Sequence, residues 1–151
     1  MRDPEQRFQE LIQKLRTRAY RLTPQRVALI RLLASSEGHP DAAELYRRLL
    51  EQFPTTSLAT VYKTLNLLKE MGEVLEIEID GIGGEGSRFD GNDPTPHPHL
   101  ICVRCHRILD GQVSLTEEIL QAVQGQSGYR VISHRLDFYG ICPECQAQGA
   151  N

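Results

Sequence analysis

All four cysteines of the chain occur as two Cys-x-x-Cys pairs in its last third, Cys102 with Cys105 and Cys142 with Cys145. Each pair turns two thiolates toward one ion, and two pairs complete the tetrahedral S₄ shell that zinc prefers. The 36 residues between the pairs exceed the gap of a compact zinc ribbon. They are enough for a strand, a helix and a second strand, so the pattern predicts a small domain whose ends are held together by structural zinc.

Two other uses of these cysteines stay open. Disulfide bonds are disfavoured in the reducing cytosol, where we expect this chain because its N-terminus lacks the apolar core of a signal peptide. No apolar run approaches the ~18 residues of a membrane-spanning helix. Residues 102–106 also match the C-x-x-C-H pattern of covalent haem attachment, which usually accompanies export and leaves the second pair unexplained. We interpret His106 as an ordinary surface residue.

The net charge of −3 conceals a division of the chain into a basic and an acidic part. Residues 1–69 carry a balance of +5, and residues 70–151 carry −8. Such asymmetry favours a basic module that meets a polyanion beside an acidic module with another role, although a solvated surface would explain it too.

Four amphipathic helices are predicted in the basic part by apolar spacing and capping residues. The first covers residues 5–18, and the next three begin after Thr23, Asp41 and Ser57, whose side-chain oxygens suit an N-cap. Helix 57–70 is expected to end at Gly72 and to keep Thr60, Lys63, Thr64 and Lys69 on its polar face. The side chains expected to face the core are Phe8, Leu11, Ile12, Leu15, Val27, Ala28, Ile30, Leu32, Leu33, Leu45, Leu49, Leu50, Phe53, Leu58, Val61, Leu65 and Leu68.

A β-hairpin is predicted where the apolar period changes from 3.6 to 2. Leu75, Ile77 and Ile79 alternate with acidic residues as far as Asp80, a glycine-rich turn follows over 81–86, and 87–90 form the returning strand. Helices followed by a hairpin are the order of a winged helix-turn-helix, with 57–70 as the recognition helix.

A second small domain follows the turn-forming segment 91–96. Short β-like runs over 100–103 and 107–109 precede a helix opened by a Ser114/Glu117 capping box and closed by Gly125 and Gly128, and 129–139 return as a strand. Leu115, Ile119, Leu120 and Val123 form the inner face of that helix. We predict an α+β protein with a winged-helix domain over 1–90, a linker over 91–96 and a metal-binding domain over 97–151, which would gain stability from a metal or a dimer partner.

Histidines and carboxylates indicate a second metal site. His97 and His99 are two residues apart, so on a strand both imidazoles project from one face. Asp90 and Asp110 could add oxygen ligands, and His39 could complete the set. Such a set suits Fe²⁺, Mn²⁺, Co²⁺ or Zn²⁺ about equally, and solvated linker histidines are the plain alternative.

Several motifs in order resemble the ferric uptake regulator family of metal-dependent, dimeric bacterial transcription repressors. They span nearly the whole chain: 22–26 (LTPQR), 38–40 (GHP), 57–65 (SLATVYKTL), 88–90 (RFD), 97–102 (HPHLIC), 139–142 (YGIC) and the two cysteine pairs. The resemblance implies structural zinc on the four cysteines and a second domain that forms a homodimer. It also implies a regulatory site made of His39, Asp90, His97, His99 and Asp110, which would hold Fe²⁺ or Mn²⁺, with Zn²⁺ possible in vitro.

The resemblance further implies that the protein binds double-stranded DNA, with an operator that we expect to be AT-rich and palindromic. The expected DNA-contacting residues are Arg18, Tyr20, Arg21, Ser57, Thr60, Tyr62 and Lys63. Tyr62 would contact thymine methyl groups and Lys63 a phosphate or base edge, while packing at the helix edge is the alternative for Tyr62.

Two departures from the family pattern refine the expected subtype. Many iron-sensing members use a further site where this chain has Pro96 and Pro98, so His134 would be left without partners there. Asp110 stands where iron-sensing members commonly carry glutamate. Aspartate at this position resembles the peroxide-sensing branch, in which bound Fe²⁺ reacts with hydrogen peroxide and a ligand histidine is oxidised. We therefore expect a cytoplasmic repressor, not an enzyme, that senses Fe or Mn and hydrogen peroxide. The alternative is an iron- or zinc-sensing regulator of metal uptake without peroxide chemistry.

Two further classes of function stay as rivals. One is an enzyme or electron carrier that uses a Cys-x-x-Cys pair as a redox dithiol or a haem attachment site. The other is a constitutive DNA-binding protein whose only metal is structural. In the preferred mechanism a regulatory metal ion shifts the population toward a closed form that fits successive half-sites on DNA.

Overall fold

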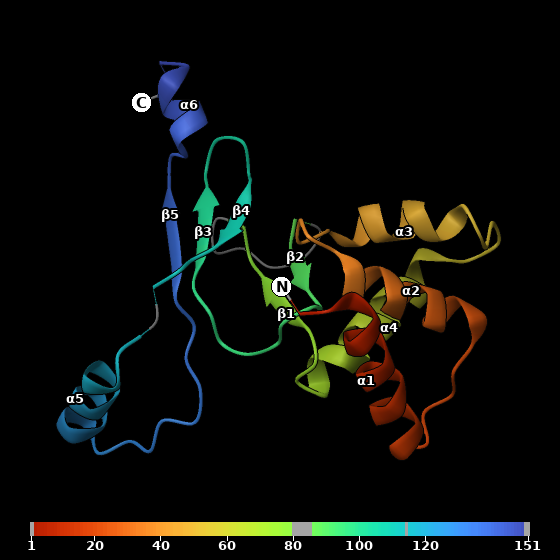
Figure 1. Cartoon of the computed structure of the whole chain (residues 1–151), viewed down its shortest axis with the longest axis horizontal. Helices are drawn as coiled ribbons and strands as arrows, with labels where there is room; N and C mark the ends of the chain where they lie inside the picture. The colour runs from red at the N-terminus through yellow and green to blue at the C-terminus, as the bar shows by residue number, and fades with distance from the viewer. Residues whose placement is uncertain (1, 80–85, 114, 150–151) are drawn as a thin grey trace. The chain divides into compact units, whose positions relative to one another are not determined.

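The computed structural model describes residues 2–79, 86–113 and 115–149, which divide into two compact units, Met1–Pro94 and Thr95–Asn151 (Figure 1). Each unit combines helices with a small sheet, and the predicted α+β class is confirmed. Within those ranges, no helix has both the length and the apolar character needed to cross a lipid bilayer.

Four helices make up most of the first unit; the N-caps of the second, third and fourth are those that the sequence predicts, and the first begins after Asp3. The helices are α1 (Pro4–Thr17), α2 (Pro24–Ser35), α3 (Ala42–Leu50) and α4 (Leu58–Glu70). The side chains of Thr23, Asp41 and Ser57 each accept a hydrogen bond from the backbone N–H three residues later. These bonds satisfy N–H groups that a helix start leaves unpaired.

The helices pack around one apolar core, in which the prediction for α4 needs two corrections. Leu58 is 41% exposed, because the first residue of the helix extends past the buried stripe. Thr64 is buried, because it shares the i, i+3, i+4, i+7 face with Val61, Leu65 and Leu68. Its hydroxyl donates to the Thr60 carbonyl at 3.0 Å, which satisfies the polar group inside the core.

On α2 the buried face also differs in part from the prediction. Leu29 and Ala34, which the pattern did not single out, are fully buried with Ile30 and Leu33. Three predicted core residues are only partly buried against this cluster, namely Val27, Ala28 and Leu32. The four predicted core residues of α1 are all buried: Phe8, Leu11, Ile12 and Leu15.

Helix α4 ends at a glycine turn and is followed by the predicted hairpin. Gly72 has φ of +73°, and its N–H and that of Glu73 donate to the carbonyls of Lys69 and Leu68. Strand β1 (Leu75–Ile77) pairs antiparallel with β2 (Arg88–Asp90). Helices α2 to α4 with this hairpin form a winged helix. The predicted strand residue Asp80 and the turn glycines 81, 83 and 84 lie outside the described residues.

A buried arginine ties α1 to both ends of the hairpin. The Arg7 guanidinium donates to the Glu73 carboxylate at 3.0 Å, to the Glu73 carbonyl at 2.7 Å and to the Gly91 carbonyl at 2.9 Å. Lys14 donates to the other Glu73 carboxylate oxygen at 2.5 Å. Burial favours the neutral form of Glu73, but the hydrogen bonds from Lys14 and Arg7 outweigh it and hold its pKa below the usual value.

The segment after β2 is closely packed against the C-terminal end of α2. A Cβ at Gly91 would lie 2.8 Å from the Leu33 Cβ, so a larger residue does not fit there. The Asn92 amide donates to the carbonyls of Ala34 and Arg2, and its oxygen accepts from the Arg2 N–H. The first residues of the chain are thereby fixed to the end of the hairpin.

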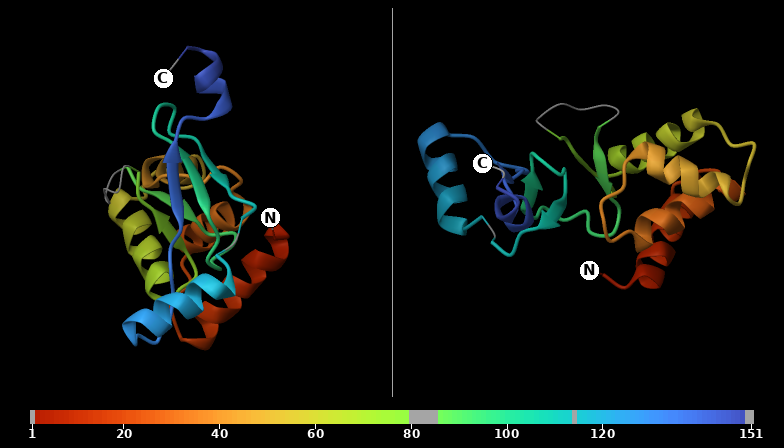
Figure 2. Two further views of the ribbon diagram at one scale, coloured as in Figure 1. Left: turned by 90° about the vertical axis from the view of Figure 1, so that its left-hand side faces the viewer. Right: turned by 90° about the horizontal axis from the view of Figure 1, so that it is seen from above.

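The second unit contains a three-stranded mixed sheet. Strand β3 (His99–Cys102) lies between β4 (Ile108–Asp110), which is antiparallel to it, and β5 (Asp137–Gly140), which is parallel. The remaining elements are α5 (Glu117–Ser127) and the short α6 (Pro143–Ala147). Figures 1 and 2 show α5 set apart from the three strands.

Three predictions for this unit are corrected. The N-cap of α5 is Thr116, whose side chain accepts from the Ile119 N–H, and the predicted cap Ser114 lies outside the described residues. The helix runs through Gly125 and stops at Gly128, which has φ of +72°. Within the predicted strand 129–139 only the last part, from Asp137, is paired, because the preceding residues lie alongside no strand of the described chain.

The predicted inner face of α5 is only partly covered by the described part of this chain, and Leu115 and Leu120 on it are half-buried. Ile119 is 48% exposed and Val123 is 47% exposed, and no described residue of the helix is buried. Leu100, Leu109 and Phe138 on the three strands are exposed as well. The apolar periodicity of α5 is real, but the described residues of its unit leave about half of the Ile119 and Val123 side chains exposed.

Candidate metal centres

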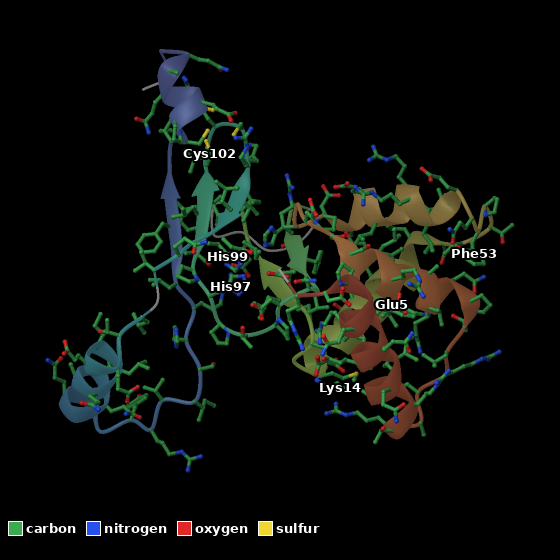
Figure 3. All side chains as sticks on the ribbon, in the orientation of Figure 1. Glu5, Lys14, Phe53, His97, His99 and Cys102 are labelled. Atoms are coloured by element: carbon green, nitrogen blue, oxygen red, sulfur yellow. The ribbon has the colours of Figure 1, made fainter. Side chains whose placement is uncertain are left out.

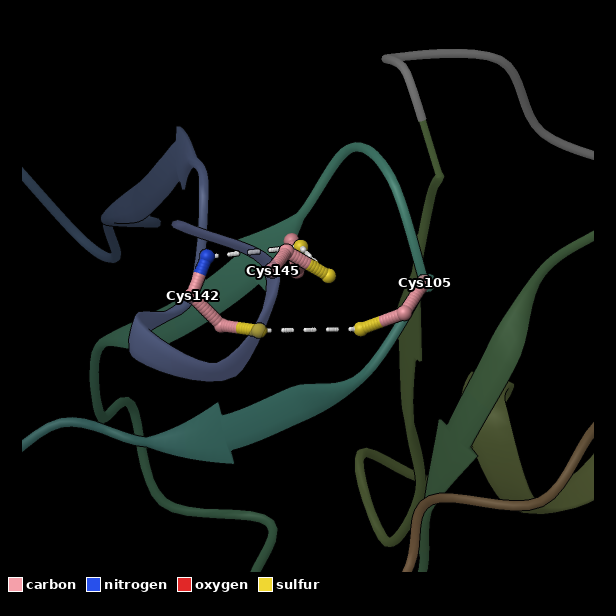
Figure 4. Close-up of side chains that lie close together, drawn as sticks. Cys105, Cys142 and Cys145 are labelled. Carbon is pink, nitrogen blue, oxygen red and sulfur yellow. Dashed lines mark hydrogen bonds between the residues drawn. The ribbon is translucent and has the colours of Figure 1, made fainter. Parts of the chain in front are cut away.

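The four cysteines converge in the second unit; Figure 3 labels Cys102, and Figure 4 shows Cys105, Cys142 and Cys145 at close range. Cys102 ends β3, Cys105 follows in the next turn, and Cys142 and Cys145 cap and enter α6. The sulfur atoms of Cys102 and Cys145 are 3.9 Å apart and those of Cys105 and Cys142 3.8 Å apart, with all four within 4.8 Å of one another. Tetrahedral zinc with Zn–S bonds of about 2.3 Å requires sulfur pairs separated by roughly 3.8 Å.

The same distances distinguish the predicted zinc site from disulfide bonds. All four thiols are free, and their sulfur atoms are too far apart for a disulfide bond. His106, the histidine of the haem-like pattern, is exposed and has φ of +59°. The cluster is an S₄ site of the geometry that structural zinc prefers.

Backbone groups prepare one of the thiols for metal binding. Hydrogen bonds from the backbone N–H groups of Cys105 and Cys142 lower the pKa of Cys102 to about 6. A hydrogen bond with Cys142, burial and the neighbouring sulfurs raise the pKa of Cys145 to about 12. The thiolate is the form that binds zinc, so these hydrogen bonds favour the metal-binding form of Cys102, whereas Cys145 depends on the charge of an ion to lose its proton.

Two histidines and an aspartate form a second cluster in the same unit, at the opposite end of β3 (Figure 3). The His97 and His99 rings lie 4.5 Å apart, and both Nε2 atoms face Asp110 Oδ1, at 3.2 Å and 3.8 Å. His97 Nδ1 lies 2.7 Å from the Thr95 carbonyl, which only accepts, so Nδ1 carries the hydrogen. In the neutral ring a lone pair on Nε2 then faces a carboxylate, an arrangement that a cation between them stabilises.

A third histidine and carboxylate meet within the first unit. His39 follows α2 in a tight turn with φ of +50°, and Asp90 ends β2. A hydrogen bond from the Phe89 N–H to the Pro40 carbonyl holds the turn beside the strand. His39 Nε2 lies 3.3 Å from Asp90 Oδ2, while Asp90 Oδ1 accepts the backbone N–H groups of residues 92 and 93 at 3.1 Å. Both side chains are buried.

Sequence reasoning missed one residue of the second unit, Asp137. Its Oδ1 lies 3.2 Å from His99 Nδ1, on the side of the ring away from Asp110. The two residues are 38 positions apart and meet only because β3 and β5 pair in parallel with His99 opposite Asp137. No local pattern indicates that register.

The predicted DNA-contacting residues all belong to the first unit. Arg18, Arg21, Ser57 and Lys63 are exposed, as is Tyr20. Thr60 is half-buried, and Tyr62 packs partly against the core. Ser57 also caps α4, so part of its role is structural.

Around His134, a pocket of the second unit is also lined by Pro96, His97 and Pro98. The two prolines offer no side-chain ligand to a metal. The absence of a further metal site at this place stays a prediction.

Comparison with known proteins decides the family. The model of the ferric uptake regulator family matches residues 17–139. The chain belongs to this family. The resemblance drawn from its motifs is thereby confirmed.

Individual relatives agree with this assignment. The peroxide-responsive repressor PerR of Staphylococcus epidermidis is 39% identical over 142 residues, which cover 94% of this chain and 92% of that protein. The Helicobacter pylori ferric uptake regulator has the same fold, with a TM-score of 0.77 over 96% of this chain and 95% of that one at 23% identity. The Streptococcus pyogenes PerR structure, described as a basis for peroxide sensing and gene regulation, is 33% identical, with a TM-score of 0.52 over 92% of each chain.

Proposed function

We propose that the protein is a metal-dependent DNA-binding transcription repressor that senses Fe²⁺ or Mn²⁺ and, when it holds iron, hydrogen peroxide. The observation that carries the proposal is the pair of His/Asp clusters, His39 with Asp90 and His97 with His99 and Asp110, in which every residue except Asp110 is buried or half-buried. Their donors are nitrogen and oxygen atoms, which suit these ions. The sequence identity of 39–41% to peroxide-responsive repressors supports assignment to the peroxide-sensing branch of the family.

The regulatory site would use one ion to join ligands from both units. His39 and Asp90 belong to the first unit, and His97, His99 and Asp110 to the second. An ion that binds all five would favour one arrangement of the units, which is a population shift toward the DNA-binding form. The four cysteines would hold a separate structural zinc ion and take no part in sensing.

The peroxide response would release this ion by altering a ligand. Fe²⁺ held by these ligands would supply the redox chemistry that activates hydrogen peroxide, and the imidazole would be the net two-electron reductant. Overall, one oxygen atom of the peroxide ends on the imidazole of His39 or His97, and the other leaves as water. The oxidised ring would be a poorer ligand, so the ion would bind less tightly and the population would shift away from the DNA-binding form. Mn²⁺ in the same site would leave the histidines unchanged.

DNA would be bound by the winged helix of a homodimer. Helix α4 would enter the major groove, with Tyr62 on thymine methyl groups and Lys63 on a phosphate or base edge. Ser57 and Thr60 would lie at the groove, and three residues around the end of α1 would contact the backbone or minor groove: Arg18, Tyr20 and Arg21. We expect a palindromic, AT-rich operator and a cytoplasmic protein without catalytic turnover.

The test combines mass spectrometry with DNA binding. Iron-loaded and manganese-loaded protein is exposed to hydrogen peroxide, and peptides containing His39 and His97 are weighed. We expect one added oxygen atom with iron and none with manganese. DNA selected from a random duplex library with Mn²⁺-loaded protein then serves as the binding probe. On this DNA, iron-loaded protein should lose affinity after peroxide treatment.

Ligand variants complete the test. His97→Ala and His99→Ala should lose metal-dependent DNA binding, while the matched control His106→Ala, an exposed histidine outside both clusters, should retain it. Wild-type DNA binding by the two ligand variants, with or without metal, would refute the regulatory site.

The second candidate is a regulator of metal uptake that senses iron or zinc without peroxide chemistry. It is favoured by the donor set itself, which does not distinguish Fe²⁺, Mn²⁺ and Zn²⁺. Unmodified histidine peptides after peroxide treatment of iron-loaded protein, together with metal-dependent DNA binding, would select this candidate.

A further inference from the structure

His99 is flanked by an aspartate on each neighbouring strand. It lies on the central strand β3, opposite Asp110 of β4 and opposite Asp137 of β5. Directly opposed residues of paired strands project from the same face of a sheet. The three side chains therefore form a row across the sheet, with the imidazole in the middle.

The two ring nitrogens of His99 face different carboxylates. Nδ1 lies 3.2 Å from Asp137 Oδ1, within hydrogen-bonding distance, and Nε2 lies 3.8 Å from Asp110 Oδ1, on the side of His97. A carboxylate only accepts, so the bond to Asp137 keeps the hydrogen on Nδ1. The neutral ring then carries its lone pair on Nε2, the atom that faces the other candidate ligands.

Asp137 is itself held in place by an arginine. The Arg135 guanidinium donates to Asp137 Oδ2 at 3.0 Å, so the two carboxylate oxygens have different partners. This bond fixes the direction in which the other carboxylate oxygen, Oδ1, points. Asp137 is 14% exposed and His99 is buried, so water competes little for their hydrogen bond.

We infer that Asp137 is a positioning residue of the regulatory metal site, which holds His99 in the tautomer and orientation that bind an ion through Nε2. The inference rests on the proposed function, because it assumes that His99 is a ligand. His97 differs in this respect, since its Nδ1 donates to the neutral Thr95 carbonyl. A carboxylate behind the ring makes the imidazole a stronger donor, so His99 is the more firmly bound ligand of the two.

The experiment compares Asp137→Ala and Asp137→Asn with wild type and with His99→Ala, in full-length protein that retains structural zinc. The Mn²⁺ dissociation constant is measured from the electron paramagnetic resonance signal of free Mn²⁺. Nitrogen-15 spectra of the regulatory-metal-free protein near pH 8 report the His99 tautomer. Glu118→Gln, an exposed acidic residue of α5, is the matched control.

We expect Asp137→Ala to weaken Mn²⁺ binding by about 10- to 100-fold and to mix the His99 tautomers. Asp137→Asn, whose amide oxygen still accepts the Nδ1 hydrogen, should keep the tautomer and weaken binding by a smaller factor. Glu118→Gln should change neither quantity.

Three results would overturn the inference. If His99→Ala weakens Mn²⁺ binding but Asp137→Ala changes neither affinity nor tautomer, the positioning role fails and the metal site stands. If His99→Ala also leaves Mn²⁺ binding unchanged, the proposed site fails with it. Should Asp137→Ala lose structural zinc, Asp137→Asn decides, and wild-type Mn²⁺ affinity in that variant overturns the inference.

Discussion

Helix α4 of the first unit buries Val61, Leu65 and Leu68, whereas α5 of the second leaves Ile119 and Val123 about half exposed. The first unit surrounds one apolar core with four helices and a hairpin. In the described part of the second unit, the buried apolar side chains besides two cysteines are Pro98, Ile101 and Ile108. The two units therefore depend on different interactions for their stability.

The difference shows what each unit needs from outside. Apolar burial of the extent seen in the first unit is the main favourable contribution to folding. The second unit lacks it and has instead the S₄ cluster and a partly uncovered apolar helix face. Its stability should follow metal content and self-association, while that of the first unit should not.

Removal of structural zinc should have the largest effect on this comparison. Cys142→Ser, or a strong chelator, is expected to unfold the second unit, because structural zinc contributes on the order of 10 kcal/mol to such domains. Hydrogen exchange should show lost protection in β3 to β5 and retained protection in α1 to α4. The control Glu144→Gln lies beside the cysteines without being a ligand. Loss of protection in both units would contradict the separation.

A shortened side chain in the apolar core should destabilise the first unit and leave the zinc site of the second unit unchanged. Leu65→Ala is expected to lower the unfolding free energy of the first unit by about 2–5 kcal/mol and to leave the zinc content at one ion per S₄ site. Leu58→Ala on the same helix should cost under about 0.5 kcal/mol, because that side chain is already exposed. Chemical denaturation followed by circular dichroism measures both, and equal effects would contradict the core described.

Acid should destabilise the first unit through Glu73. The native pKa of this carboxyl lies below its ordinary value of 4.5, so its contribution is present above that pH and is lost as pH falls through the native pKa. Glu73→Gln should cost about 2 kcal/mol at pH 7, because the buried Arg7 then keeps only the more distant Glu10 carboxylate, at 3.7 Å, as a counter-charge. The variant should also lose less stability between pH 5 and 3, roughly, than wild type. Glu70→Gln, which is exposed, should follow the wild-type curve.

The smallest expected effect concerns the exposed face of α5. Ile119→Glu with Val123→Glu should raise the dissociation constant of the proposed homodimer by tenfold or more, about 1.4 kcal/mol. Analytical ultracentrifugation measures this constant. Exposed Glu117→Gln is the control, and the thermal unfolding of α1 to α4 should not change. A monomeric wild-type protein would show that this face has another use.

The features that sequence predicted well depend on neighbouring residues. The N-caps Thr23, Asp41 and Ser57 act over three positions, and each Cys-x-x-Cys pair is a single turn, so spacing alone indicates them. The closeness of the His97 and His99 rings is expected from their two-residue spacing, although His97 precedes β3 and only His99 lies on that strand.

The features that it missed depend on distant parts of the chain. Asp137 reaches His99 through the parallel register of β3 and β5, which no local pattern encodes. Arg7 is buried because Glu73 and Gly91 come to it from the hairpin. The apolar period of α5 predicts a face but not what covers it. The strand predicted over 129–139 is too long for the same reason, because only its last residues, from Asp137, lie beside a strand with which they can pair.

Close packing after β2 limits where a chain of this kind can change length. An insertion between Phe89 and Asn92 would move Gly91 out of its contact with Leu33 or separate the Asn92 amide from the Ala34 carbonyl. It would also displace Asp90, whose position depends on the backbone of the next residues. Residues 51–55, mostly exposed, impose no such limit, so tags or reporter domains inserted into the first unit belong there.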